Sequence, residues 1–275
     1  MALLTAVPLL LFGRQSMEVA TSEARSGSEE VLLRDAARNA VFVGRWMADR
    51  AEILEAWPQV FPGRVETFDD NLRGGLLNAV YRGLPSAATV VLVDEEGRLV
   101  ADPVFKSQPG ERRTGSAARS QELIRRLPLQ VAMQTGLATG DPYVSLEDDL
   151  VSVPMATVAA AWTDESGVER RLLLGAELVL DVATEIESTA DMGIALLDGE
   201  GEALLGQGHP LVYPELLRPV LGTHLNIAHA LPDGSEVHGA TAPVPSTDWT
   251  IVVLRPASVV LGPARQIQTN LSVLI

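Results

Sequence analysis

Apolar side chains recur with a helical period over residues 14–57. The stripe includes Leu32, Ala36, Val43, Trp46, Met47, Ile53 and Leu54. This stretch is longer than an ordinary globular helix, so it predicts a long stalk helix over residues 14–64 that ends at Pro58 and the Pro62-Gly63 pair. A second, shorter helix is predicted over residues 66–81.

Farther along the chain, one order of elements occurs twice. Residues 88–100 pass from an apolar run through a tight turn to a second apolar run, which predicts a β-hairpin. Residues 192–205 repeat it, and both copies share the skeleton apolar-Leu-x-Asp-x-Glu-Gly-x-x-apolar. Each hairpin precedes two longer strand signals, at residues 149–162 and 170–180 in the first half and 236–244 and 249–254 in the second. The repeat predicts two copies of one α+β unit, at residues 65–185 and 186–256.

Both ends of the chain are strongly apolar. Residues 1–12 contain one polar residue, Thr5, but they fall short of the roughly 20 residues that cross a bilayer. No basic residues precede them, as they would in a signal peptide. They fit the last turns of a transmembrane helix over residues 1–13, and residues 257–275 fit an exit helix that leads into a second one. The alternative is a soluble protein whose N-terminal helix packs on its own core.

The composition narrows the function classes. The 275 residues carry 21 basic and 36 acidic side chains, a net charge of −15, and such a surface repels nucleic acid. There is no cysteine, which excludes disulfides, zinc-thiolate sites, iron–sulfur clusters and cysteine nucleophiles.

Four stretches, taken in order, resemble the double-Cache family of extracytoplasmic sensor domains. They are VVLVDEEGRLVADP, PLQVAMQTGLATGDPYVS, AAAWTDESGVERRLLLGAELVLD and PVPSTDWTIVVLRP, and the resemblance spans residues 14–260. It implies an α+β fold with a long N-terminal stalk helix and two tandem PAS-like modules, each a mainly antiparallel sheet flanked by helices. The module at residues 65–185 would be the membrane-distal one.

The resemblance also implies a function. The chain would be the periplasmic input domain of a bacterial inner-membrane receptor. It would act as a homodimer, bind a small solute in the distal module and pass a conformational change to the membrane helices. Any catalytic output domain would lie outside this chain, so neither enzyme activity nor a cofactor is expected.

One subset of this family binds amino acids, and the resemblance maps its motif onto this chain in part. The motif arginine falls on Arg126 and a later tyrosine on Tyr143. The tryptophan and tyrosine that follow the arginine become Pro128 and Leu129, and the two aspartates become Ser145 and Glu177. Charged hydrogen bonds contribute about 1–3 kcal/mol each, so these losses predict that the domain is not a standard amino-acid receptor. With one aromatic residue added, the candidate ligand contacts are Arg126, Tyr143, Ser145, Trp162 and Glu177.

Each candidate also has a plain structural explanation. Arg126 ends a helix and complements its dipole, Tyr143 suits strand packing, Trp162 suits the core, and Glu177 faces solvent in one strand alternation. If the pocket is collapsed, the chain is instead a dimerisation or protein-interaction module.

No metal site is expected. The histidines are His209, His224, His229 and His238, and loop positions are the default expectation for them. His224 and His229 are five residues apart, which fits neither one helix face nor one strand face. The carboxylate runs lack the spacing of an EF-hand, and no nucleotide loop or catalytic triad motif is present.

Overall fold

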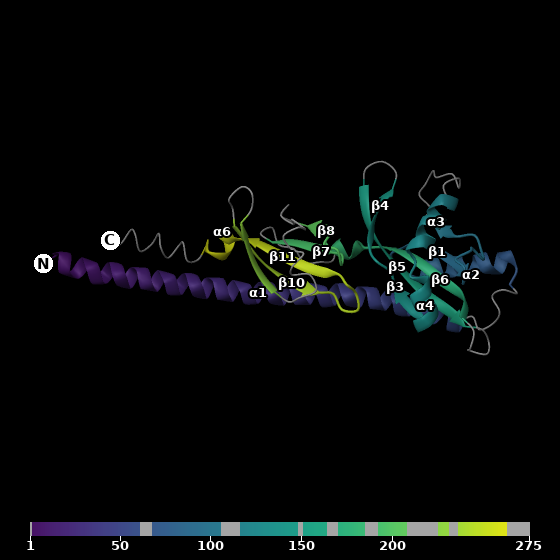
Figure 1. The fold of residues 1–275 in the computed structure, drawn as a ribbon, viewed down its shortest axis with the longest axis horizontal. Helices are drawn as coiled ribbons and strands as arrows, with labels where there is room; N and C mark the ends of the chain where they lie inside the picture. Colours follow the sequence, from purple (N-terminus) through teal and green to yellow (C-terminus); the bar gives the residue numbers. More distant parts are fainter. Residues whose placement is uncertain are drawn as a thin grey trace. The chain divides into compact units, whose positions relative to one another are not determined.

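The structure is a computed structural model. It describes residues 2–60, 68–105, 116–147, 151–163, 170–184, 192–207, 225–230 and 236–262. The chain forms two compact units: Val43–Glu185, and a unit that combines Met1–Phe42 with Ile186–Ile275. Figure 1 labels most of the helices and strands of both units.

The first helix, α1 (Ala2–Val60), extends beyond the predicted stalk at its N-terminal end and reaches past Pro58 at the other. Its buried side chains recur every three or four residues, at Leu32, Ala36, Ala40, Val43, Met47, Ala51 and Leu54. Proline lacks the backbone N–H that continues a helix, and α1 ends soon after Pro58, at Val60. Among the residues that the structure describes, no helix is both long enough and apolar enough to cross a membrane.

The unit Val43–Glu185 contains an antiparallel sheet with the order β2-β1-β6-β5-β3, and β4 also pairs with β5. Its strands are β1 (Ala87–Asp94), β2 (Val104–Phe105), β3 (Leu137–Thr139), β4 (Tyr143–Glu147), β5 (Val151–Thr163) and β6 (Arg170–Val179). Its helices after α1 are α2 (Asp70–Gly83), α3 (Ser116–Arg126), α4 (Leu129–Thr135) and the short 3-10 helix η3 (Asp181–Thr184).

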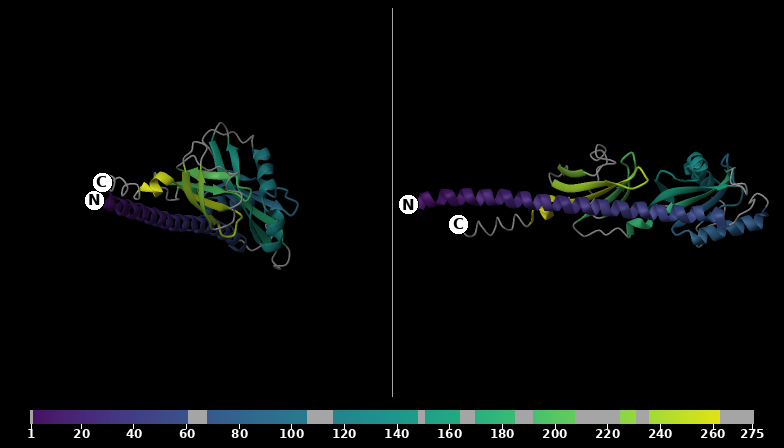
Figure 2. Two further views of the ribbon diagram at one scale, coloured as in Figure 1. Left: turned by 60° about the vertical axis from the view of Figure 1, so that its left-hand side comes forward. Right: turned by 90° about the horizontal axis from the view of Figure 1, so that it is seen from below.

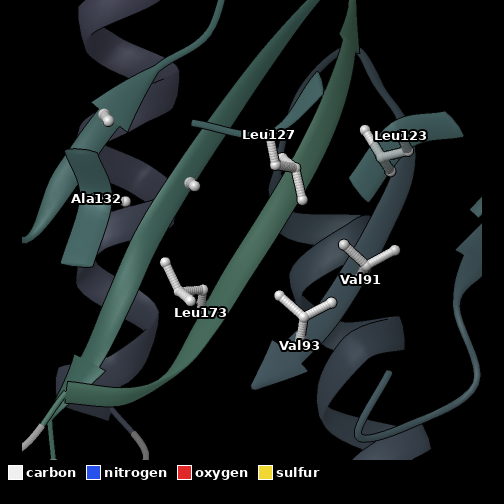
Figure 3. Close-up of a cluster of buried hydrophobic side chains, with 8 residues drawn as sticks. Val91, Val93, Leu123, Leu127, Ala132 and Leu173 are labelled. Atoms are coloured by element: carbon white, nitrogen blue, oxygen red, sulfur yellow. The ribbon is translucent and has the colours of Figure 1, made fainter. Parts of the chain in front are cut away.

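The two faces of this sheet carry different side chains, because successive residues of a strand point to opposite sides. One face packs against α3 and α4 (Figure 3), in a cluster of Val91, Val93, Leu123, Leu127, Ala132, Ala138, Ala159 and Leu173. The opposite face carries Val90, Leu92, Val158, Trp162 and Leu174, which are also buried. The sheet is therefore covered on both sides, as its mostly apolar strands require.

The second unit contains another antiparallel sheet, with the order β8-β7-β11-β10-β9 (Figure 2). Its elements are β7 (Gly193–Leu197), β8 (Ala203–Gln207), β9 (Leu225–Ala230), β10 (Glu236–Pro243), β11 (Thr250–Pro256) and α6 (Ala257–Val260). In both sheets, the two hairpin strands come first in chain order. The strand that comes last in chain order pairs with the first hairpin strand, as β6 does with β1 and β11 with β7. The strand order confirms the tandem antiparallel modules predicted from the sequence repeat.

The two hairpin turns have the same hydrogen bonds. In each, an aspartate Oδ1 accepts bonds from the backbone N–H groups two and four residues later. These bonds measure 3.1 and 2.8 Å at Asp94, and 3.0 and 2.8 Å at Asp198. Gly97 and Gly201 close the turns with φ of 78° and 89°, a left-handed conformation that favours glycine. The repeated sequence thus folds into a repeated local geometry.

Two elements differ from the sequence expectation. The second helix begins at Asp70 rather than residue 66, because the side chain of Asp69 caps it by accepting a hydrogen bond from the N–H of Leu72 at 2.8 Å. The first hairpin returns through a single bridge, Val93 to Leu99, and pairs again only at β2. The turn expected at residues 164–167 and most of the expected exit helix, residues 263–275, lie outside the described residues.

Candidate functional site

Three polar side chains form a row across the centre of the first sheet. Glu177 on β6 pairs in register with Thr89 on β1 and with Thr157 on β5. Direct cross-strand partners point to the same side of a sheet, so the three share one face. That face is the one that packs against α3 and α4, because Thr89 lies two residues from Val91 on β1. Glu177 is only 4% exposed and both threonines are fully buried.

The buried carboxylate of Glu177 accepts hydrogen bonds on both oxygens. Thr89 Oγ1 donates to Oε2 at 2.7 Å, and the phenol of Tyr143 donates to Oε1. A carboxylate buried among apolar side chains is costly unless donors compensate the lost water, and these two hydroxyls supply that compensation. Tyr143 reaches Glu177 from β4, the strand that pairs with the far side of β5.

Arg126 stacks on the aromatic ring of Tyr143. Its guanidinium carbon lies 4.0 Å from the centroid of the Tyr143 ring, which is a cation–π contact. Its Nε and one terminal nitrogen both donate to Oε1 of Glu122, at 2.8 and 2.7 Å. The backbone carbonyl of Arg126 accepts a hydrogen bond from Thr157 Oγ1 at 3.0 Å, which ties the end of α3 to the polar row.

Gly175 lets α3 reach the sheet beside Glu177. A Cβ at this position would lie 2.5 Å from a methyl carbon of Leu127 and 3.0 Å from a methyl carbon of Val91. Real Cβ atoms do not approach other atoms at such a distance, so any larger residue would push Leu127 away. Because Leu127 follows Arg126 directly, the glycine also sets the height of Arg126 above the sheet.

Gly140 likewise permits a close approach of two segments, on the opposite side of the site. A Cβ there would overlap Thr157 Oγ1 and would lie 2.8 Å from the carbonyl oxygen of Arg126. The N–H of Gly140 also donates to the carbonyl of Thr157 at 2.8 Å. The loop between β3 and β4 can therefore come close enough to place Tyr143 over the sheet.

The five residues predicted from the sequence are not all brought together. Arg126, Tyr143 and Glu177 form one contiguous chain of contacts. Trp162 is 4% exposed and lies on the opposite face of the sheet, because it is an odd number of residues from Thr157 on β5. Ser145 follows Tyr143 on β4, where its backbone pairs with Val153.

The sequence reasoning missed Thr89, Thr157 and Glu122. The signal for Thr89 is its position as the one hydroxyl residue in the otherwise apolar run 87–93. Its pairing with Glu177 spans 88 residues, so it depends on the register of two strands that are distant in sequence. Glu122 lies one helical turn before Arg126, a spacing that predicts an ion pair on any helix surface.

At the positions that match this row, the second sheet carries no polar side chain. Its hairpin turn aligns Asp198 with Asp94, and the register of the strands then equates Gly193, Leu254 and Gly239 with Thr89, Glu177 and Thr157. Leu254 pairs with Gly193 and Gly239 just as Glu177 pairs with the two threonines. Of the two sheets, the first one therefore carries polar side chains at these matched positions.

The described residues contain no group of three or more side chains able to hold a metal ion. His238 is buried on β10, and its Nε2 lies 3.7 Å from a carboxylate oxygen of Glu236. His229 lies on β9, whereas His209 and His224 are outside the described residues.

Solved structures share this architecture. The ligand-binding domain of the Campylobacter jejuni chemoreceptor Tlp3, in complex with L-norvaline, superposes with a TM-score of 0.61 at 14% identity, over 86% of this chain and 94% of that one. The periplasmic sensory domain of Tlp1 from the same organism gives 0.59 at 12% identity, over 87% and 99%. The ligand-binding domain of Pseudomonas aeruginosa PctB, in complex with L-Arg, gives 0.59 at 17% identity, over 88% and 93%.

No protein-family model matches the sequence, and the curated sequences give no match either. The relationship is therefore visible in the fold rather than in overall identity. The long N-terminal helix and the two antiparallel modules are the features that these neighbours share with this chain. The chain has the fold of the periplasmic ligand-binding domains of bacterial chemoreceptors, the double-Cache architecture that its sequence motifs resemble.

Proposed function

We propose that this chain is the extracytoplasmic ligand-sensing input domain of a transmembrane signalling receptor. The observation that carries the proposal is the buried Glu177, held by Thr89 and Tyr143 on the α3–α4 side of the first sheet. A carboxylate fixed in this way offers a preorganised acceptor for a cationic or hydrogen-bonding solute. A ligand that binds one arrangement of the site better than another shifts the population toward it, and the membrane helices would carry that shift inward.

The proposed ligand is a small solute other than a standard amino acid. Tlp3 and PctB have been crystallised with L-norvaline and L-Arg. In this chain Pro128 and Leu129 stand where the amino-acid motif has aromatic residues, and Arg126 is paired with Glu122. The site retains a carboxylate and two hydroxyls that suit an amine, whereas the groups that would bind an α-carboxylate are reduced.

Two measurements on the purified chain test this proposal. Isothermal titration against the twenty amino acids should give no micromolar binding. Micromolar affinity for several of them would contradict the proposal that the ligand is not a standard amino acid. A thermal-shift screen of amines, organic acids and purines should find a solute that raises the Tm by several degrees. The shift should vanish in Glu177→Gln and persist in Glu96→Gln, which removes the same charge from an exposed position.

A second candidate function has its own observation. Ile124, Leu129 and Met133 pack against the buried cluster, so apolar side chains occupy the region where the motif would supply aromatic ligand contacts. A filled site of this kind suits a dimerisation or protein-interaction module. A flat thermal-shift screen, together with a concentration-dependent dimer in light scattering, would favour this function over ligand sensing.

The proposed location is the inner membrane of a bacterium, with this domain in the periplasm and a homodimer as the assembly. The fold shared with periplasmic sensory domains supports the periplasmic part of this proposal. We propose no catalytic role for the chain and no cofactor. Fusing this domain to a reporter that is active only in the periplasm would test the location. A silent periplasmic reporter, together with activity of a matching reporter that works only in the cytoplasm, would contradict it.

A further inference from the structure

Arg126 already binds a carboxylate within its own helix. Two guanidinium nitrogens, Nε and a terminal nitrogen, converge on Oε1 of Glu122 at 2.8 and 2.7 Å. Both distances are those of charge-assisted hydrogen bonds. The neighbouring Arg125 adds a weaker contact to the second oxygen of Glu122, at 3.9 Å.

The position of this pair matters because Arg126 also covers the site. Its guanidinium stacks on the ring of Tyr143, whose hydroxyl donates to Glu177. The order of contacts is therefore Glu122, Arg126, Tyr143 and Glu177, with a carboxylate at each end. The side chains of Arg126 and Glu122 are 39% and 51% exposed, so solutes can reach the pair.

Building on the proposed ligand-sensing function, we propose that Glu122 is a specificity-determining residue of this site. It supplies the carboxylate that Arg126 binds, and an incoming carboxylate must displace it to reach the same nitrogens. A ligand that carries only a cationic or neutral group does not compete with Glu122. The pair therefore lowers the affinity for anionic and zwitterionic solutes relative to amines.

The size of the effect follows from the exposure of the pair. Exposed ion pairs between residues four apart on a helix contribute little, since water and salt screen them. Removing Glu122 is expected to raise the affinity of Arg126 for a simple carboxylate by about two- to fivefold. The selectivity against carboxylates is therefore modest, but a two- to fivefold change in affinity is large enough for a titration to resolve.

The experiment follows the side-chain Nε–Hε resonance of Arg126 in the full 275-residue chain labelled with ¹⁵N. Loss of the signal in Arg126→Lys identifies it. Sodium propionate and propylamine hydrochloride serve as the carboxylate and amine probes, with the ionic strength held constant by sodium chloride. The variants are Glu122→Gln and, as a second removal, Glu122→Ala. Glu96→Gln is the matched control, because Glu96 is 54% exposed and pairs with Arg98 in the hairpin turn.

The expected result is a propionate titration of Arg126 that tightens about two- to fivefold in both Glu122 variants and stays unchanged in Glu96→Gln. Equal propionate affinity in the wild type and the Glu122 variants overturns the inference. So does an Arg126 signal that propionate moves in no variant. If the Glu122 effect appears but no screened solute depends on Glu177, the inference stands and the proposed sensing function fails.

Discussion

At the scale of single residues, the site depends on the hydroxyl groups around one buried carboxylate. Glu177 receives one hydrogen bond on each oxygen, from Thr89 and from Tyr143. A buried carboxylate that loses a donor still bears the cost of its lost hydration. Removing either hydroxyl should therefore destabilise the fold by more than the net stabilisation of an ordinary hydrogen bond. Arg126 contributes less to stability, because its main ion pair is half exposed.

The Tyr143→Phe variant isolates the phenol from its ring. The ring still stacks under Arg126, but Oε1 of Glu177 loses the phenol hydroxyl as a donor. We expect the free energy of unfolding to fall by about 1–3 kcal/mol in urea titrations. Combining Tyr143→Phe with Glu177→Gln should cost less than the sum of the single changes, since a neutral amide needs the phenol less. Additive losses would show that the hydroxyl and the carboxylate act independently.

Gly175→Ala tests the close approach of α3. The new methyl group would displace Leu127, and we expect a loss of about 1–3 kcal/mol from overpacking. Gly74→Ala is the control of opposite sign, because nothing lies within 4 Å of a Cβ there. Alanine in that helix should stabilise the protein by up to about 1 kcal/mol. Chemical denaturation of both variants gives the comparison, and two losses of equal size would contradict it.

At the scale of elements, the turn of the first hairpin adds a charged contact to a geometry that the second hairpin shares. Arg98 Nε donates to Oδ2 of Asp94 at 2.7 Å, whereas the matching residue in the second turn is Glu202. Partial burial acts to raise the pKa of Asp94, but the hydrogen bonds from the Arg98 N–H and guanidinium, with the Arg98 charge, hold it below its usual value. The first turn is therefore sensitive to acid in a defined direction.

The sign of that dependence gives a prediction for Asp94→Asn. A carboxyl whose pKa is lowered by folding stabilises the folded state above the ordinary value of about 3.9, and the contribution disappears as the pH falls through the lowered value. The variant should be less stable than the wild type at pH 6, and the difference should shrink between about pH 4 and pH 3. Urea titrations at these pH values measure it. Asp198→Asn is the matched turn, and a difference for Asp94→Asn that is constant down to pH 3 would contradict the mechanism.

The sequence predicted elements better than it predicted contacts between them. The stalk helix, both hairpins and the long strands follow from local periodicity and turn residues, which neighbouring residues determine. The row of Thr89, Glu177 and Thr157 depends on the pairing of strands that are far apart in the chain, and no local pattern encodes that register. Trp162 shows the same limit, because a single-residue shift along a strand moves a side chain to the other face.

At the scale of the whole molecule, the net charge of −15 acts on every equilibrium of the chain. Like charges repel one another in the compact folded state. At physiological ionic strength, salt largely screens the repulsion between exposed charges that are more than about 8 Å apart. A cationic ligand gains from the same field, while an anionic one must overcome it in addition to the Glu122 pair.

We therefore expect the Tm to rise by a few degrees when sodium chloride is raised from about 20 mM to about 300 mM. Differential scanning calorimetry at constant pH measures the change. A neutral osmolyte at equal osmolality controls for effects other than screening. A Tm that is flat or falls with salt would mean that local ion pairs such as Arg126–Glu122 outweigh the general repulsion.

The contrast between the two sheets has a consequence for how this protein can change over evolutionary time. The two sheets share one strand arrangement but carry different rows at matched positions, threonine-glutamate-threonine in one and glycine-leucine-glycine in the other. Leu254 in the second row is a buried apolar side chain, so a volume-conserving exchange such as Leu254→Met should cost less than about 1.5 kcal/mol. Under the proposed function, substitution in the first row changes what the molecule recognises. Under that proposal, a new specificity can arise at three positions of the first sheet, while the second sheet keeps the strand order that both sheets share.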